Sequence, residues 1–105
     1  MEEELGLELD PPDGVEDAET AVEVLRAWIG DGALLVSLNA SAFDDHVRDW
    51  GRLLAEIGHH VAKAAELNGY MSEDEARGAL RQAFVASFDA SSGPTIGKLR
   101  GQIKH

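Results

Sequence analysis

The residues best suited to chemistry in this 105-residue chain are a glutamate and two histidines, Glu56, His59 and His60. The spacing Glu-x-x-His places a carboxylate and an imidazole on the same face of a helix. This pair is half of the carboxylate di-iron arrangement, which needs a second such motif and two further carboxylates. Imidazole and carboxylate also suit zinc. One hypothesis is therefore a metal-binding protein or metalloenzyme, with the second half of the site supplied by a second copy of the chain.

The position of these residues on the helix argues against a metal site. On a helical wheel they share the polar side with Arg48, Arg52, Lys63 and Glu66. A di-iron site projects into the core of a bundle, whereas oppositely charged pairs three or four residues apart stabilise a solvated face by about 0.2–0.5 kcal/mol each. We therefore interpret the segment as a surface lattice of ion pairs and keep the metal site as the alternative.

A second candidate is His46, which directly follows Asp44 and Asp45. A carboxylate beside an imidazole is half of a general-base pair. No Ser or Cys nucleophile is positioned by the sequence to complete it, and acidic residues are typical of helix N-termini, where they offset the helix dipole. We interpret the cluster as a helix cap and assign no catalytic residue and no cofactor.

Both candidates depend on one long helix, predicted from Phe43 to Leu67 with Ser41, Asp44 or Asp45 as its N-cap and Gly69 at its C-terminal end. A bulky apolar stripe contains Val47, Trp50, Leu54, Ile57, Val61 and Ala64. A neighbouring stripe of small residues contains Gly51, Ala55, Gly58, Ala62 and Ala65. Together the stripes cover roughly 200° of the circumference, twice the about 100° of an ordinary surface helix. The helix therefore needs two packing partners.

Residues 22–39 are predicted to form a β-hairpin that turns at Asp31-Gly32. Apolar residues spaced by three and four also permit a helix across residues 15–29. Asp-Gly between two runs rich in branched and aromatic residues favours the hairpin, because a type I′ turn needs φ > 0 at both central positions. In that register one face carries Leu25, Ala27, Ile29, Leu34, Val36 and Leu38. The opposite face carries Arg26, Trp28, Leu35 and Ser37.

The remaining segments complete an α+β domain over residues 15–92. Ser72 to Glu75 form a capping box that opens a second helix ending near Ala90. This helix is expected to bury Ala76, Leu80, Ala83, Phe84, Ser87 and Phe88. Residues 1–14 form either an acidic arm or an edge strand, because Leu5, Leu7 and Leu9 alternate with polar residues. Residues 93–105 are predicted to be a basic, flexible tail. The expected fold is a small antiparallel sheet packed on an αα-hairpin.

A hairpin of this size is marginal alone, so its outer face is expected to be covered. We predict a homodimer in which Trp28, Leu35 and Arg26 lie at the interface, since two-fold dimers are the commonest closed assembly.

The composition excludes several classes of function. The formal net charge is −11, which argues against nucleic acid as a partner. The absence of cysteine excludes disulfides and thiolate chemistry and fits the cytosol. No apolar run reaches the roughly 18 residues of a membrane span. Ten of the acidic residues precede residue 26, so the acidic N-terminal arm is expected to suit a basic protein partner.

Several segments, in their order and spacing, resemble a family of small bacterial proteins of about this chain's length, catalogued as a domain of unknown function. The segments are 24–29, 31–32, 36–38, 43–45, 50–54 and 60–63. In that family a histidine often precedes the Val-Ser-Leu segment, where this chain has Leu35. The resemblance implies no activity, cofactor or site. The expected function is that of a non-enzymatic interaction or regulatory protein, with metal binding as the alternative.

Overall fold

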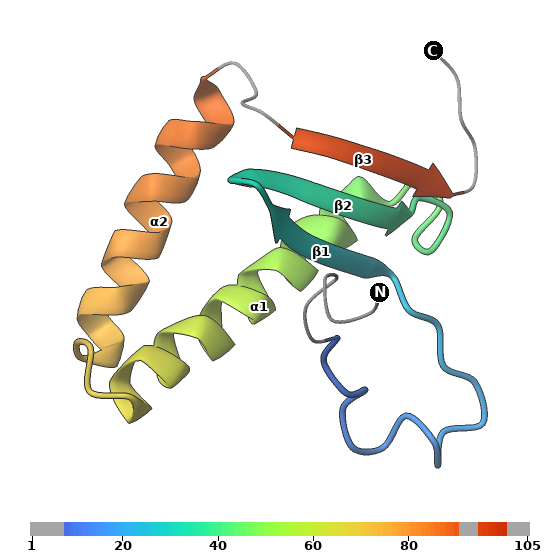
Figure 1. The fold of residues 1–105 in the computed structure, drawn as a ribbon, viewed down its shortest axis with the longest axis horizontal. Helices are drawn as coiled ribbons and strands as arrows, with labels where there is room; N and C mark the ends of the chain where they lie inside the picture. Colours follow the sequence, from blue (N-terminus) through green and yellow to red (C-terminus); the bar gives the residue numbers. More distant parts are fainter. Residues whose placement is uncertain (1–7, 91–94, 101–105) are drawn as a thin grey trace.

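The computed structural model describes residues 8–90 and 95–100, the last six as backbone only. Along the chain the elements are β1 (Leu25–Gly30), β2 (Ala33–Asn39), α1 (Val47–Leu67), α2 (Glu73–Asp89) and β3 (Thr95–Arg100). The strands form one sheet in the order β1-β2-β3. The sheet packs against the helical layer, and α2 returns from the end of α1 (Figure 1). The predicted α+β fold is confirmed.

The hairpin has the register that the Asp-Gly turn predicts. Strand β1 is antiparallel to β2, with Ile29 opposite Leu34 and Leu25 opposite Leu38. Asp31 and Gly32 have φ of 51° and 80°, so both central residues of the turn are left-handed. This backbone matches the twist of the flanking strands and fixes which side chains share a face.

Replacing Gly32 with Ala is expected to lower the free energy of unfolding by about 1 kcal/mol, because a Cβ strains the left-handed turn. Gly78→Ala is the matched control. Gly78 lies inside α2, and a Cβ there would meet no described atom within 4 Å, so the change should raise stability by about 0.5–1 kcal/mol. Urea denaturation measures the free energy of unfolding of both variants. If Gly32→Ala and Gly78→Ala change it by the same amount in the same direction, the assigned turn is contradicted.

Helix α1 begins at Val47, four residues later than the sequence predicts, and none of the predicted capping side chains caps it. His46 occupies the N-cap position without a side-chain hydrogen bond. The preceding segment is a series of turns, with Asp44 at φ 51°. The ring of Phe43 meets Trp50 edge to face at 5.1 Å between centroids. Phe43 therefore packs onto the helix instead of extending it.

The turn between the helices follows the predicted chemistry. Gly69 has φ of 77° after the last residue of α1. The Gly69 N–H donates to the Glu66 carbonyl and the Tyr70 N–H to the Ala65 carbonyl, at 3.0 and 2.9 Å. These two bonds define a Schellman motif, which ends α1 and reverses the chain.

Helix α2 opens with the predicted capping box. Ser72 Oγ accepts from the Glu75 N–H, and Glu75 Oε1 accepts from the Ser72 N–H, both at 3.1 Å. Replacing Ser72 with Ala should cost about 1 kcal/mol of stability, because an N–H of the first turn loses its acceptor. Glu75→Gln keeps an acceptor oxygen in place and should cost less. A larger loss for Glu75→Gln in thermal unfolding would be inconsistent with this cap.

The structure differs from the predictions for both ends of the chain. The flexible tail predicted for residues 93–105 is wrong for Thr95–Arg100, which form β3 parallel to β2. A parallel neighbour requires a long crossover, and α1 and α2 supply it. The sheet is therefore mixed, not purely antiparallel. At the other end, residues 8–24 contain no strand, and the rest of the predicted N-terminal strand lies outside the described residues.

The interior of the described chain is small. The buried apolar residues there are Ala62 and Ala76, which are 0% and 4% exposed and lie near the turn where α1 and α2 contact each other. The chain exposes 9164 Å², whereas a compact monomer of its mass exposes about 5,700 Å². Its radius of gyration is 15.7 Å, against about 13 Å for a compact domain of this length. A single chain is therefore an open structure.

Candidate functional site

Glu56, His59 and His60 lie along the middle of α1, and all three are exposed. Within the described part of the chain, no three His, Cys, Asp or Glu residues are grouped so that they could hold a metal ion. On the same polar face, Arg52 donates to Asp49 Oδ1 at 2.9 Å. The predicted surface lattice consists of Asp49, Arg52, Glu56, His60 and Lys63, and this is the one pair of it that the described residues show as an ion pair.

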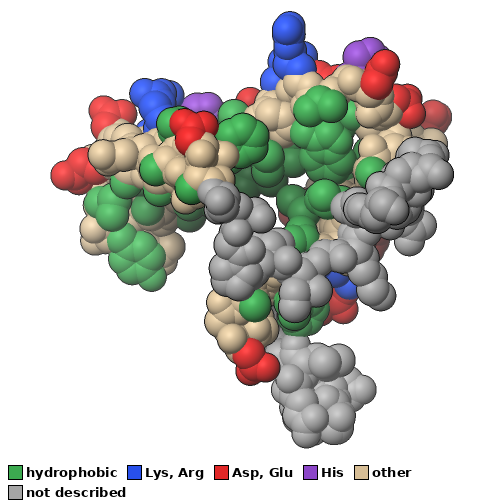
Figure 2. Space-filling view, turned by 90° about the horizontal axis from the view of Figure 1, so that it is seen from above, with side chains coloured by type: hydrophobic (Ala, Val, Ile, Leu, Met, Phe, Trp, Pro, Cys, Tyr) green, Lys and Arg blue, Asp and Glu red, His purple; other side chains and the backbone are tan. Residues whose placement is uncertain are grey.

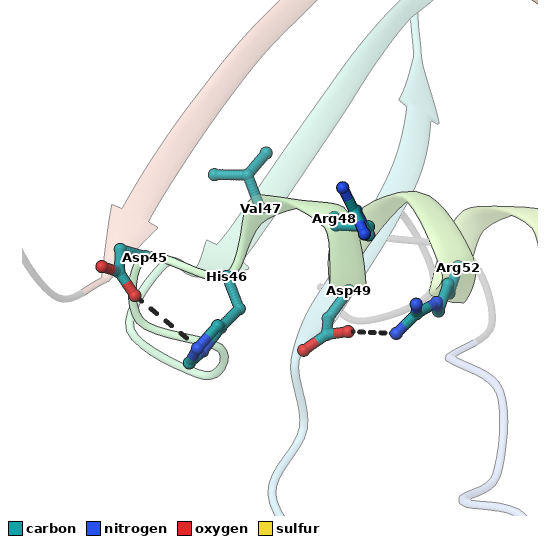
Figure 3. Close-up of a pocket in the computed structure, with 6 residues that line it drawn as sticks. All are labelled: Asp45, His46, Val47, Arg48, Asp49 and Arg52. Atoms are coloured by element: carbon teal, nitrogen blue, oxygen red, sulfur yellow. Dashed lines mark hydrogen bonds and ion pairs between the residues drawn. The ribbon is translucent and has the colours of Figure 1, made fainter.

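An open depression of about 560 Å³ lies at the N-terminus of α1 (Figure 3). It is lined by Asp45, His46, Val47, Arg48, Asp49 and Arg52. His46 Nδ1 lies 3.9 Å from Asp45 Oδ1, which is too far for a hydrogen bond, and both side chains are mostly exposed. No hydroxyl or thiol lines the depression. The pair therefore lacks both the contact and the enclosure that a general base requires.

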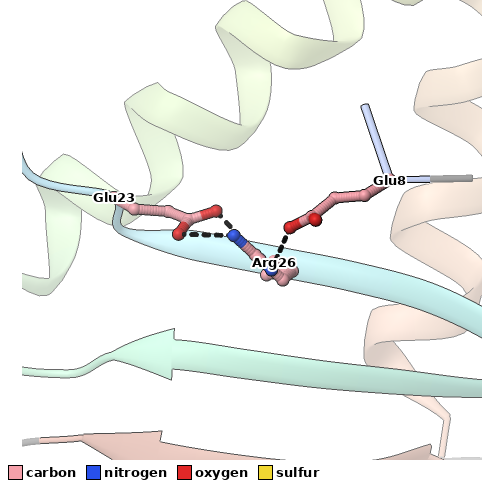
Figure 4. Close-up of polar contacts among 3 residues, drawn as sticks. All are labelled: Glu8, Glu23 and Arg26. Carbon is pink, nitrogen blue, oxygen red and sulfur yellow. Dashed lines mark hydrogen bonds and ion pairs between the residues drawn. The ribbon is translucent and has the colours of Figure 1, made fainter. Parts of the chain in front are cut away.

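Arg26 is held by two carboxylates on the surface of the hairpin (Figure 4). Its Nε and Nη2 donate to Glu23 at 3.0 Å each, and its Nη1 donates to Glu8. The hydrogen bonds and charge of Glu23, followed by the charge of Glu8, raise the pKa of Arg26 above its ordinary value. Because an arginine is protonated at all ordinary pH values, its raised pKa stabilises the fold there, and this effect is lost only in strong base. Between pH 5 and 9 this cluster therefore adds no pH dependence through Arg26.

The hairpin face predicted as an interface is only partly open. Trp28 and Leu35 are half-buried, and Arg26 is already paired with Glu23 and Glu8. On the opposite face Ile29 is 73% exposed. The tip of the hairpin therefore exposes apolar surface on the side that the sequence assigns to the interior.

The larger exposed apolar area lies on the helices. Every residue of α2 from Arg81 onward is exposed, including Phe84 at 53% and Phe88 at 76%. Their rings are stacked, with centroids 5.5 Å apart and planes 11° apart. On α1, Leu54, Ile57 and Val61 remain 42–47% exposed. In Figure 2 hydrophobic side chains gather beside a hollow, while charged ones lie along the outer edge.

We call this the helical apolar surface, made of Leu54, Ile57 and Val61 of α1 with Leu80, Phe84 and Phe88 of α2. The sequence shows these residues as apolar stripes but places them in the interior. The width of the stripes could have indicated this exposure, because two helices and a small hairpin do not provide enough packing partners to cover stripes this wide.

Comparison with known proteins identifies the family but no activity. None of the helices described here is long and apolar enough to span a membrane. No curated protein matches the sequence. A solved structure described as a "putative pyruvate dehydrogenase from the photosynthetic bacterium Rhodopseudomonas palustrus CGA009" is 36% identical, with a TM-score of 0.66. The match covers 82% of this chain and 87% of that one. Residues 8–92 match the family model described as domain of unknown function DUF5076, and the chain belongs to that family.

Proposed function

We propose that this protein is a small cytosolic homodimer that acts through interaction, as an adaptor or regulator, and performs no catalysis itself. The observation that carries the proposal is the exposed area of 9164 Å², about 3,400 Å² more than a compact monomer of this mass exposes. Obligate homodimers bury about 2,000–5,000 Å² in total, or half of that from each chain. That excess belongs partly to the exposed segment 8–24 and partly to the exposed apolar side chains of α1 and α2.

The pattern of exposure supports association over catalysis. Large exposed apolar side chains are typical of interaction surfaces, and Phe84 and Phe88 are large, stacked and uncovered. Turnover of an α-keto acid such as pyruvate would need a cation for its carboxylate in a site that excludes water. Arg48 and Arg52 instead line an open depression. We therefore do not extend the description of the Rhodopseudomonas structure to this chain.

The charge distribution suggests the partner that a regulatory dimer would bind. The acidic side chains between Glu8 and Glu23 are all exposed, and Glu8 and Glu23 both reach Arg26 at the hairpin. A basic protein would be attracted to this segment, and salt would weaken the attraction. Binding that is unaffected by salt, or by deleting residues 1–20, would refute this part of the proposal.

Small-angle X-ray scattering tests the homodimer. Two chains that fill each other's open side should scatter as a 22.6 kDa particle, twice the 11.3 kDa of one chain. Its radius of gyration should be about 17 Å, the value for a compact domain of that length. A particle of 11.3 kDa with a radius near 15.7 Å would show that the open chain exists alone and would overturn the proposal.

A further inference from the structure

We propose that the second copy binds in the angle between α1 and α2. Each chain places the Phe84–Phe88 pair of its α2 against the Leu54, Ile57 and Val61 stripe on α1 of the other. The inference rests on the proposed homodimer and assigns its interface to the helical apolar surface instead of the outer hairpin face.

Helix α2 supplies the inserting element. Its last two turns are exposed all round, although no residue from Gln82 to Phe88 is charged. Phe84 and Phe88 are one turn apart and already stacked, so little side-chain freedom remains to be lost on binding. Large aromatic side chains with this exposure are typical anchors of protein interfaces.

Helix α1 supplies the receiving surface. Leu54, Ile57 and Val61 keep nearly half of their surface exposed in the middle of a 21-residue helix. Beside them, Gly51 and Gly58 have no described atom within 4 Å of where a Cβ would lie. The small-residue stripe is therefore open next to the bulky one, and a second helix has room to approach. Only further along, at Ala62, is that stripe fully buried.

The exposed area favours a second copy as the occupant, and charge restricts where that copy can bind. Two chains with a formal charge of −11 each repel one another, so their contact must lie on surface without acidic residues. The stripe on α1 and residues 82–88 of α2 meet this condition. Two-fold symmetry makes the contact reciprocal. One arrangement therefore covers the apolar stripe of α1 and the apolar stripe of α2 on both chains. The hairpin face offers less, because Trp28 and Leu35 are already half-buried and Arg26 is charged.

Sedimentation velocity on the full chain tests this assignment with a matched pair of variants. Phe84→Asp places a carboxylate in the interface twice, once from each chain, and should weaken dimerisation at least about a thousandfold. Gln82→Asp adds the same charge two residues away, about 200° around α2, and should leave the dimer intact. A folded Phe84→Asp variant that remains as dimeric as the unmodified protein would overturn the interface.

Cross-linking keeps the inference testable if Phe84→Asp fails to fold. Because the chain has no cysteine, Val61→Cys and Ser87→Cys chains can be mixed by joint refolding and treated with a short bis-maleimide. The mixture should give a cross-linked heterodimer. If a sample of Arg26→Cys chains cross-links and the mixture of Val61→Cys and Ser87→Cys chains does not, the interface lies on the hairpin and the proposed helical interface is refuted. A monomeric unmodified protein would instead refute the homodimer itself.

Discussion

The melting temperature of this protein is expected to rise by about 5–11 °C when its concentration is increased a hundredfold. A dimer whose chains are not stable apart gains about 2.7 kcal/mol from a hundredfold rise in partner concentration. For a unit of about 200 residues, each kcal/mol shifts the melting temperature by about 2–4 °C. The physical cause is the small interior of one chain, in which the buried apolar residues that the structure describes are two alanines.

Circular dichroism at low concentration and calorimetry at high concentration measure this shift. Gln82→Asp is the control and should keep the concentration dependence, because its charge lies away from the helical apolar surface. A melting temperature that is constant across the range would mean that unfolding does not involve dissociation, and it would contradict a dimer held together by its core.

Replacing Ala62 with Leu is expected to lower the free energy of unfolding by about 1–3 kcal/mol. Ala62 is 0% exposed and lies near the end of α1, in the region where α1 and α2 contact each other. Three additional heavy atoms at a closed site force the helices apart or the side chain out of its rotamer. The change therefore acts on the contact that sets the angle between the two helices.

Ala79→Leu is the matched control, since Ala79 is exposed on α2 and lies about 140° around that helix from Phe84. Leu and Ala differ little in helix propensity, so this variant should unfold close to the unmodified protein in urea. If Ala62→Leu and Ala79→Leu unfold at the same urea concentration, the close approach of the helices at Ala62 does not exist in solution.

The elements set by local chemistry were predictable from the sequence. The hairpin register follows from Asp31-Gly32, where both residues take φ > 0. The start of α2 follows from the reciprocal hydrogen bonds of Ser72 and Glu75, and the end of α1 from Gly69. In each case the signal lies within four residues and needs no tertiary context.

The elements that depend on distant parts of the chain were not predictable from the sequence. Strand β3 exists because β2 offers a free edge more than fifty residues earlier in the chain. The residues of Thr95–Arg100 do not alternate between apolar and polar, so the sequence does not predict a strand there. The first turn of the predicted long helix is lost because Phe43 packs on Trp50. The apolar stripes were visible, but whether Phe84 and Phe88 face an interior or a second chain depends on the angle between α1 and α2, which no local pattern encodes.

Native mass spectrometry of untagged protein, purified without nickel, tests the central claim most directly. It reports the number of subunits and any bound metal or small molecule in one experiment. We predict a dimer of 22.6 kDa, twice the mass of one 11.3 kDa chain, with no additional mass. A chain that remains monomeric at micromolar concentration would contradict the homodimer. A dimer carrying a whole number of metal ions, lost on replacing His59 or His60 with Ala, would contradict the assignment of that face as a surface lattice.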